Sequence, residues 1–188
     1  MTLTALLLVG GQSRRMGSDK AGLLLKGEPL WARQLRILRE LQPEALWISA
    51  RVPPAWRPPE VEFVPDEPPS RGPLSGIAAA LQRLPTSHLL VLAIDLPQMT
   101  PEHLRQLCTL TRPACGVIPR RGELFEPLCA LYPVEAASTA QTALAGSDVS
   151  LQHFAKILLG HDQLQIHALS AAEEPLYRNI NTPADLWV

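Results

Sequence analysis

Apolar residues along the chain alternate between short unbroken runs and longer stretches in which they recur every three or four positions. Unbroken runs are typical of strands buried on both faces, and spaced apolar residues are typical of amphipathic helices. The runs predict strands at 3–9, 44–50, 61–65, 88–94, 115–119, 125–133 and 164–169. The spaced stretches predict helices at 29–41, 73–84, 100–110, 134–145 and 150–159.

Local signals sharpen two of these boundaries. The segment "RVPPAWRPP" at 51–59 carries four prolines, which exclude regular structure and predict an extended surface crossing between two strands. Thr100, Pro101 and Glu102 supply a cap, a first-turn proline and an early acidic residue, so a helix should begin there.

The alternation of strands and helices predicts an α/β fold, a three-layer α/β/α sandwich around a Rossmann-like, mainly parallel sheet. At 188 residues the chain is near the usual size of one domain, and we expect a single domain over 1–188 with halves at about 1–100 and 101–188. In such folds ligands bind at the carboxyl ends of the strands.

Composition narrows the class of protein. No apolar run approaches the roughly 20 residues needed to cross a bilayer, and no secretory leader is visible, so we expect a soluble, cytoplasmic protein without a membrane partner. The formal net charge of −1 argues against a nucleic acid partner. Cys108, Cys115 and Cys129 form no C-x-x-C pair and are expected to be core thiols, and the five histidines show no metal-binding spacing.

Positive charge gathers near the start of the chain. Residues 1–40 hold seven Lys and Arg against three Asp and Glu, a net of +4, so residues 41–188 hold ten against fifteen, a net of −5. The excess surrounds the segment "VGGQSRRMGSDK" at 9–20, which directly follows the first predicted strand.

This glycine-rich segment has the chemistry of a phosphate loop. Gly10 and Gly11 let backbone N–H groups approach an anion closely, and Arg15 and Lys20 add positive charge. The spacing fits neither G-x-G-x-x-G nor G-x-x-x-x-G-K-[ST]. The sequence therefore predicts a polyphosphate loop of another kind; the alternative is a tight turn with solvated basic side chains.

Five segments carry a resemblance to a known family. The first, "LLLVGGQSRRMGSDKAGLLLKGEPL", is followed in order by "PDEPPSRGPLSGIAAAL", "LAIDLPQMT", "EPLCALYP" and "NINTPADL". Together they resemble the motifs of the MobA-like nucleotidyltransferases, the molybdenum cofactor guanylyltransferases, over nearly the whole chain. The resemblance implies a nucleotide-diphospho-sugar transferase-like fold, with a nucleotide-binding first half and an acceptor-binding second half.

The activity implied by the resemblance is transfer of GMP from GTP to the phosphate of molybdenum-bound molybdopterin. The products are pyrophosphate and molybdopterin guanine dinucleotide, and the required ion is Mg²⁺. GTP and molybdopterin are then the small-molecule partners, and molybdenum-insertion proteins and molybdoenzyme chaperones are candidate protein partners.

The resemblance also assigns the residues closest to the chemistry. Asp95, in "LAIDLP", is implied as the metal ligand, while Lys20 and Arg15 are implied to neutralise charge on the polyphosphate. Attack of one phosphate on another brings two anions together, so positioning and charge neutralisation are the expected sources of catalysis. The alternative for Asp95 is a cap on the turn into Pro97.

A longer set is implied to bind the two substrates. Asn179 and Asn181 are implied on the acceptor side of the cleft, where "NTPAD" alternatively marks only a helix start capped by Thr182, and Asp66 is alternatively a plain loop carboxylate. The complete set of substrate-binding candidates is Leu8, Val9, Gly10, Gly11, Lys20, Ser49, Asp66, Gly72, Asp95, Asn179 and Asn181.

Three positions depart from the family pattern. Val9 stands where alanine is usual, Ser49 stands near a frequent asparagine, and Glu126 stands where histidine or glutamine is usual. Two alternatives therefore stay open: a nucleotidyltransferase of the same fold that uses CTP or a sugar phosphate, and a GTP-binding accessory protein without catalysis.

Overall fold

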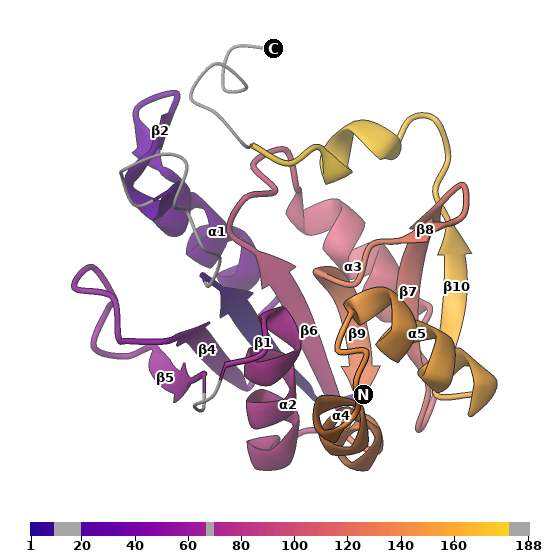
Figure 1. Ribbon diagram of the computed structural model, residues 1–188. Coiled ribbons are helices and arrows are strands. Elements are labelled where there is room, and N and C mark those ends of the chain that lie inside the picture. The colour runs from indigo at the N-terminus through magenta and orange to yellow at the C-terminus, as the bar shows by residue number, and fades with distance from the viewer. Residues whose placement is uncertain (10–19, 67–69, 181–188) are drawn as a thin grey trace.

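The computed structural model describes residues 1–9, 20–66 and 70–180, which fold around an eight-stranded sheet (Figure 1). The order across the sheet is β10-β7-β9-β6-β1-β4-β5, and β8 pairs with β7. The strands of this sheet are β1 (Leu3–Leu8), β4 (Ala45–Ala50), β5 (Glu62–Pro65), β6 (His88–Ala93), β7 (Gly116–Arg121), β8 (Leu124–Phe125), β9 (Cys129–Pro133) and β10 (Leu164–Ala168).

Parallel pairing dominates the half of the sheet that comes first in the chain. β1 pairs in parallel with β4 and β6, and β4 pairs in parallel with β5. On the other side β9 runs antiparallel to β6 and β7, while β10 is parallel to β7. The predicted mainly parallel sheet is confirmed, with β9 and the short β8 as the reversed strands.

The two central strands are buried along their whole length. Every residue of β1 and of β6 is buried, as expected for apolar runs covered on both faces. Alternate β1 side chains enter two separate cores: Leu3, Ala5 and Leu7 face one, while Leu6 and Leu8 face the other.

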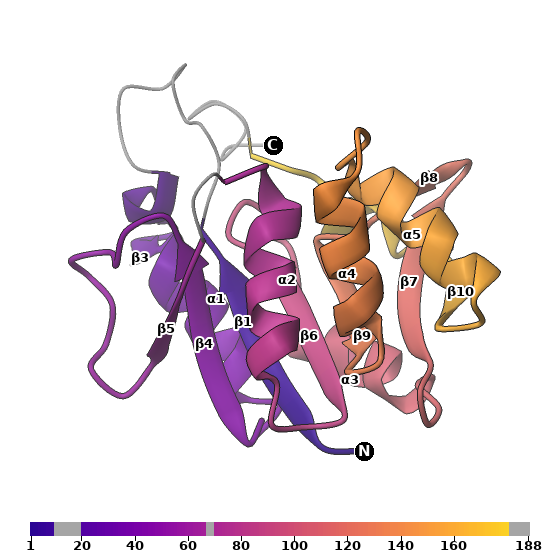
Figure 2. The same ribbon diagram turned by 60° about the horizontal axis from the view of Figure 1, so that its bottom comes forward.

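Helices cover both faces of the sheet. α1 (Leu30–Arg39) and α3 (Pro101–Thr109) pack on one core, and α2 (Pro73–Arg83), α4 (Ala136–Ala145) and α5 (Leu151–Gly160) pack on the other. Figure 2 shows α2, α4 and α5 in front of the sheet and α1 and α3 behind it. The predicted three-layer α/β/α sandwich is confirmed.

The predictions made from local sequence signals agree with the structure at the start of α3, in segment 51–59 and at the three cysteines. The Thr100 hydroxyl accepts a hydrogen bond from the backbone N–H of His103 (3.3 Å), so the predicted cap at the start of α3 is formed. The proline-rich segment 51–59 contains no helix or strand. Cys115 and Cys129 are buried and Cys108 is partly buried, all as free thiols, and burial raises the pKa of Cys129 to about 12.

One predicted strand is wrong as a single element. The segment 125–133 is divided between β8 and β9, and the backbone turns at Glu126, whose carbonyl accepts from Cys129 N–H (3.1 Å). Pro127 lies at the break and has no N–H to donate to a sheet, which explains why an apolar run did not form one strand.

Short elements between the predicted ones were not anticipated. A hairpin joins β2 (Leu24–Leu25) to β3 (Glu28–Pro29), with Lys26 and Gly27 both at positive φ (52° and 84°) in its turn. Two successive residues at positive φ match the twist of a tight hairpin. Two 3-10 helices, η1 (Lys20–Gly22) and η2 (Glu174–Tyr177), complete the described elements.

Strand β6 joins the two predicted halves, because it pairs with β1 on one side and β9 on the other. The division into nucleotide and acceptor halves within one domain stays a prediction. Among the described residues, the helices are too short or too polar for any of them to cross a bilayer.

Candidate active site

A pocket lies where β1, β4 and β5 end and α2 begins. Its volume is about 680 Å³, within the range of roughly 300–1,000 Å³ that is common for small-molecule sites. The lining residues are Leu8, Val9, Ser49, Ala50, Arg51, Val52, Pro54, Asp66, Ser70, Arg71, Gly72, Pro73, Gly76 and Val149. The carboxyl ends of parallel strands meet at this edge, so the position agrees with the rule for ligand sites in α/β sheets.

Five residues implied by the sequence to bind nucleotide line this one pocket: Leu8, Val9, Ser49, Asp66 and Gly72. The strand ends are held together by backbone hydrogen bonds from Val9 N–H to Ser49 O (3.0 Å) and from Asp66 N–H to Ala50 O (3.0 Å). Val9 and Asp66, which are distant in the sequence, are therefore positioned by the register of the sheet.

Two polar atoms in the pocket are buried without a hydrogen-bond partner among the described residues, Ser49 Oγ and Asp66 Oδ1. Ser49 is only 1% exposed, while the other Asp66 oxygen, Oδ2, accepts from the Ser70 hydroxyl (2.8 Å). Buried polar atoms are normally paired, so these two are suited to a ligand that supplies the missing partners.

Helix α2 approaches the strand ends closely because of Gly76. A Cβ at this position would lie 2.6 Å from Ser49 Oγ and 3.0 Å from Leu8 Cδ2. At the start of α2, Gly72 has a φ of 87° and provides no side-chain cap, and Pro73 follows as the first helical residue. The positive end of the helix dipole is thus open toward the pocket, where it favours an anion.

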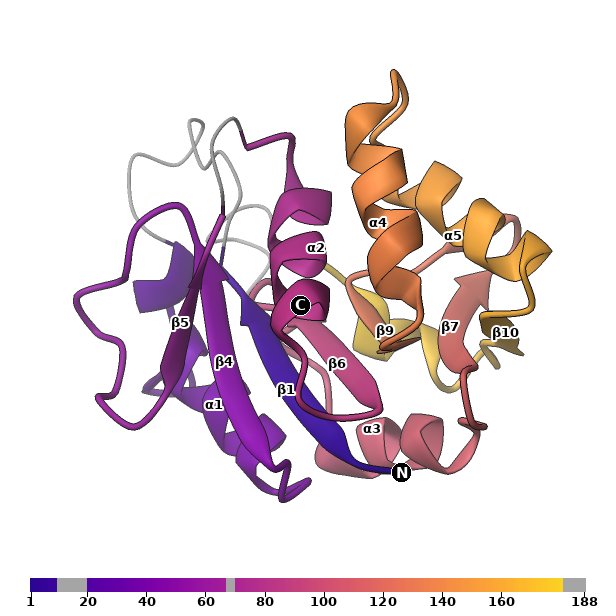
Figure 3. The same cartoon turned by 90° about the horizontal axis from the view of Figure 1, so that it is seen from below.

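Arg71, just before α2, connects this side of the pocket to the second half of the chain. Its guanidinium donates to Gly146 O (2.8 Å) and to Leu144 O at the end of α4, and its backbone N–H donates to Ser75 Oγ (2.8 Å). Helices α2 and α4 lie side by side (Figure 3). The link places Val149, in the connection after α4, at the edge of the pocket.

Asp95 lies at the same edge of the sheet, just beyond β6 and outside the pocket lining. Its turn is fixed to the neighbouring strand by Ile94 N–H, which donates to Leu8 O (3.0 Å). Helix α1 holds the turn from the other side, because Gln34 Nε2 donates to Leu96 O (2.7 Å) and Arg33 Nε donates to Pro97 O (2.8 Å). The half-buried carboxylate therefore stands on a rigid support.

The end of the described chain returns to Asp95. Ile180 N–H donates to Asp95 O (3.0 Å), which places the exposed Asn179 near the predicted metal ligand. Tyr177, at the end of η2, is buried, and its hydroxyl lies 2.6 Å from His103 Nε2. Burial lowers the pKa of His103, so a neutral imidazole is favoured in this contact.

Glu173 anchors the same returning segment. Its carboxylate accepts from Ser170 N–H (2.8 Å) and the Ser170 hydroxyl (2.7 Å), and it lies 3.0 Å from His167 Nε2. Burial by itself raises the pKa of Glu173, but these hydrogen bonds outweigh it and hold the pKa at about 2. The ionised carboxylate thus stabilises the segment that leads to Asn179.

Substitution Glu173→Gln is expected to destabilise the protein at neutral pH by about 1–2 kcal/mol, since a charged acceptor is replaced by a neutral one. The folded pKa lies below the unfolded one, so the contribution is present above about pH 4.5 and is lost as the pH falls toward 2. Urea unfolding of the native chain and of Glu173→Gln at pH 7 and at pH 3 measures this contribution to stability. An equal loss of stability at both pH values would rule out the charged carboxylate as the cause.

The fit of a metal ion can be judged from the donor set. Among the described residues there is no group of three or more His, Cys, Asp or Glu side chains that could hold a metal. A single carboxylate at a strand end suits Mg²⁺, which is usually held by one or two carboxylates together with substrate phosphates and water. Asp95 therefore fits a Mg²⁺ ion that arrives with a nucleotide, and it does not fit a protein-enclosed metal site.

Several predicted site residues lie outside the part of the chain that the structure describes, or at its boundary. Gly10, Gly11, Arg15 and Asn181 lie outside the described residues, as does the predicted helix start at Thr182. Lys20 is the first residue of η1, directly after the undescribed stretch 10–19. Their implied roles stay predictions.

Four pocket residues, Arg51, Val52, Arg71 and Val149, are not among those implied by the sequence. Arg51 and Val52 could have been found, because they follow a predicted strand end in the same way as Asp66. Val149 and Arg71 could not have been found from the sequence, since the positions of their side chains depend on the packing of α4 against α2.

Glu126, a departure from the family pattern, is partly buried beside Arg121, with 3.3 Å between Oε1 and Nη2. Burial raises the pKa of Glu126, and the Arg121 guanidinium opposes that rise. The pair occupies the β7–β8–β9 region of the predicted acceptor half.

Comparisons with known proteins agree with this geometry. The model of the MobA-like NTP transferase domain matches residues 5–163. A "Probable molybdenum cofactor guanylyltransferase" from Opitutus terrae is 37% identical over 97% of this chain and 92% of that protein. A "Molybdenum cofactor guanylyltransferase" from Syntrophotalea carbinolica is 30% identical over 97% of this chain and 88% of that protein.

A solved structure is similar over the same span. The molybdopterin-guanine dinucleotide biosynthesis protein A from Archaeoglobus fulgidus superposes with a TM-score of 0.69 at 27% identity, covering 97% of this chain and 94% of that one. The similarity in sequence and in structure thus extends over both halves of the sheet.

Proposed function

Because this chain belongs to the MobA-like NTP transferase family, we propose that it is a molybdenum cofactor guanylyltransferase. It transfers GMP from GTP to the phosphate of molybdenum-bound molybdopterin and releases pyrophosphate, in the cytoplasm and with Mg²⁺ as the ion. The observation that carries the proposal is the pocket at the ends of β1, β4 and β5, lined by Leu8, Val9, Ser49, Asp66 and Gly72.

The layout of the site suits a nucleotide that crosses the end of β1. The base and ribose occupy the pocket on the β4–β5 side, and Asp95 stands on the β6 side of the same strand. In this arrangement the triphosphate extends from the pocket across the end of β1 toward Asp95.

The reaction forms one P–O bond and breaks another. An oxygen of the acceptor phosphate attacks the α-phosphorus of GTP, and the bond from that phosphorus to the bridging oxygen of the β-phosphate breaks, which releases pyrophosphate. The nucleophile is already ionised at neutral pH, so no titrating base is required. The chain's task is to align two anions and to neutralise their charge.

Four residues and the amino end of α2 are assigned to that task. Lys20 and Arg15 neutralise the departing pyrophosphate, and the open amino end of α2 adds its dipole on the pocket side. Asp95 would hold Mg²⁺, which would supply positive charge to neutralise the reacting phosphates. Asn179, held near Asp95 through Ile180, faces the acceptor side.

Nucleotide-dependent stabilisation tests the proposal. A ligand at 100 times its dissociation constant adds about 2.7 kcal/mol to the folded state, so thermal unfolding with Mg²⁺ and each of GTP, CTP, ATP and UTP should show the largest shift with GTP. A shift with CTP alone would favour the related nucleotidyltransferase. Binding of GTP without pyrophosphate release in the presence of molybdopterin would favour a non-catalytic accessory protein.

The molybdenum-insertion proteins and molybdoenzyme chaperones implied by the sequence are proposed as protein partners, since the acceptor must be delivered and the product handed on. Co-purification of the chain with such proteins, compared with the Asp95→Ala variant as an inactive control, measures this association.

A further inference from the structure

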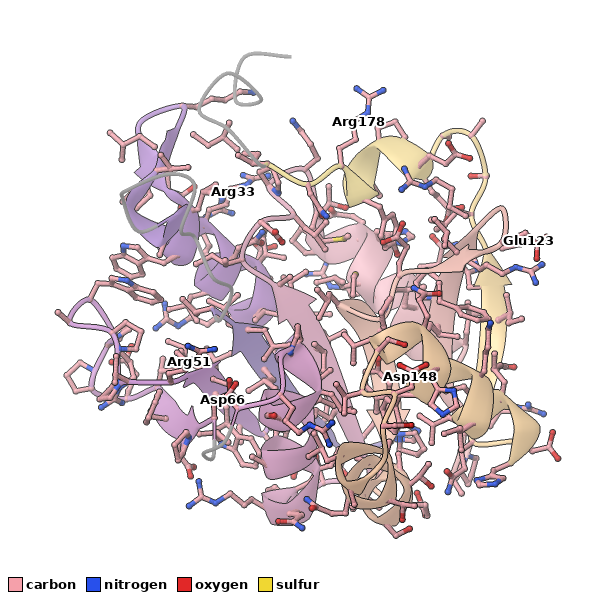
Figure 4. The ribbon with its side chains drawn as sticks, in the orientation of Figure 1. Arg33, Arg51, Asp66, Glu123, Asp148 and Arg178 are labelled. Carbon is pink, nitrogen blue, oxygen red and sulfur yellow. The ribbon has the colours of Figure 1, made fainter. Side chains whose placement is uncertain are left out.

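Arg51 and Asp66 occupy equivalent places on neighbouring strands. Arg51 directly follows β4, and Asp66 directly follows β5, which pair in parallel with Ala50 opposite Pro65. The backbone bond from Asp66 N–H to Ala50 O (3.0 Å) extends this alignment to the strand ends. Both residues line the pocket, and Figure 4 shows their charged ends near one another at this edge.

The two charges do not neutralise each other. Arg51 makes no ion pair or side-chain hydrogen bond with the described residues, and Asp66 Oδ1 is buried and has no partner among them. Arg71, the other arginine of the pocket, differs, because its guanidinium is bound to the carbonyls of Leu144 and Gly146. Arg51 is thus a cation of the pocket whose donors are available to a ligand.

Guanine presents the complementary pattern along one side of its ring system. O6 and N7 accept hydrogen bonds, and the adjacent N1–H and exocyclic N2 amino group donate them. Arginine is the side chain that most often contacts O6 and N7, and a carboxylate accepts from the two donors. Adenine carries an amino donor where guanine has O6, so a guanidinium at that place faces a donor and gains no hydrogen bond.

We propose that Arg51 is a specificity-determining residue that selects guanine by donating to O6 and N7 of the base, while Asp66 Oδ1 accepts from N1–H and the 2-amino group. The inference rests on the proposed function, which supplies GTP as the nucleotide. It adds the residue that distinguishes GTP from ATP. Ser49 Oγ, 1% exposed and without a described partner, lies on the same wall and completes the polar lining.

The test measures dissociation constants of GTP, ITP and ATP with Mg²⁺ by calorimetry for the native chain and for Arg51→Met. ITP keeps O6 and N7 but lacks the 2-amino group. Arg51→Met should weaken GTP and ITP by the same factor, about 10- to 100-fold, and leave ATP unchanged. Arg51→Lys keeps the charge but lacks the planar guanidinium, so its affinity for GTP should lie between that of the native chain and that of Arg51→Met.

One further variant tests the contribution of Asp66, and another serves as a control for Arg51→Met. Asp66→Asn should reduce the preference for GTP over ITP, since the group that accepts from the 2-amino donor is weakened. Arg83→Met is the matched control, because Arg83 is an exposed arginine at the opposite end of α2 and should leave all three affinities unchanged.

The outcomes distinguish this inference from the proposed function. A native chain that fails to bind GTP contradicts the proposed function and the inference together. A native chain that prefers GTP, with an Arg51→Met variant that weakens GTP and ATP equally or alters neither, leaves the function standing and overturns the role of Arg51 in base selection.

Discussion

Replacing Asp95 with alanine is expected to lower kcat for GMP transfer by about 10³-fold or more, a size typical of removing a group that stabilises phosphoryl-transfer charge. Asp95 stands just past β6, between the pocket and the returning segment near Asn179, and it is the proposed Mg²⁺ ligand. Under that proposal its removal would take away the counter-charge that the triphosphate and the acceptor would share.

Measurements of GTP binding and of stability separate a loss of catalysis in Asp95→Ala from a loss of folding. The turn that holds Asp95 is fixed by Gln34, Arg33 and Ile94 through backbone groups of other residues, so Asp95→Ala should keep the fold and its thermal unfolding midpoint. Calorimetry with GTP should show that Mg²⁺ no longer improves its affinity. Glu62→Ala, which removes an exposed carboxylate on β5, is the control. Full Mg²⁺-dependent turnover in Asp95→Ala would refute the metal assignment.

Replacing Gly116 with alanine is expected to destabilise the fold by about 3 kcal/mol or more. Gly116 opens β7 where this strand passes β9, and a Cβ there would overlap the carbonyl of Leu131, with Leu131 C only 2.7 Å away. The obstacle is sheet backbone, which cannot move aside as a flexible side chain can. Its N–H also donates to Gln163 O (2.9 Å), which fixes the place of β7 beside β10.

Urea unfolding of Gly116→Ala measures this loss. The control is Gly160→Ala at the end of α5, where a Cβ meets no heavy atom within 4 Å and the change should stay within about 0.5 kcal/mol. A Gly116→Ala variant as stable as the control would show that the β7–β9 approach is wider than described.

The pattern of apolar positions was sufficient to predict the layers, because β1 and β6 are unbroken runs and helices such as α3 bury residues at helical spacing. It failed at 125–133, where a proline divides an apolar run, and at the β2–β3 hairpin, whose strands are two residues long and carry no period. Short pairings of this kind depend on the turn at Lys26 and Gly27, not on burial.

The candidate site was predictable where it follows strand ends and unpredictable where it follows packing. The family resemblance implied Ser49 and Asp66 as nucleotide-binding residues after predicted strands, and the structure brings both into one pocket at the strand ends. Val149 reaches the same pocket through the packing of α4 against α2, and the Arg71 guanidinium is held there by Gly146 O. Likewise, His103 and His167 are distant in the sequence but lie on either side of Glu173, with ring centroids 6.1 Å apart.

The most direct test of the proposed function is the product itself. The purified chain is incubated with Mg²⁺, molybdenum-loaded molybdopterin and either GTP or CTP, and the pterin products are identified by mass spectrometry together with released pyrophosphate. With GTP we expect molybdopterin guanine dinucleotide and one pyrophosphate per product, and with CTP we expect no product. A cytosine dinucleotide, or GTP binding without any dinucleotide, would contradict the proposed function.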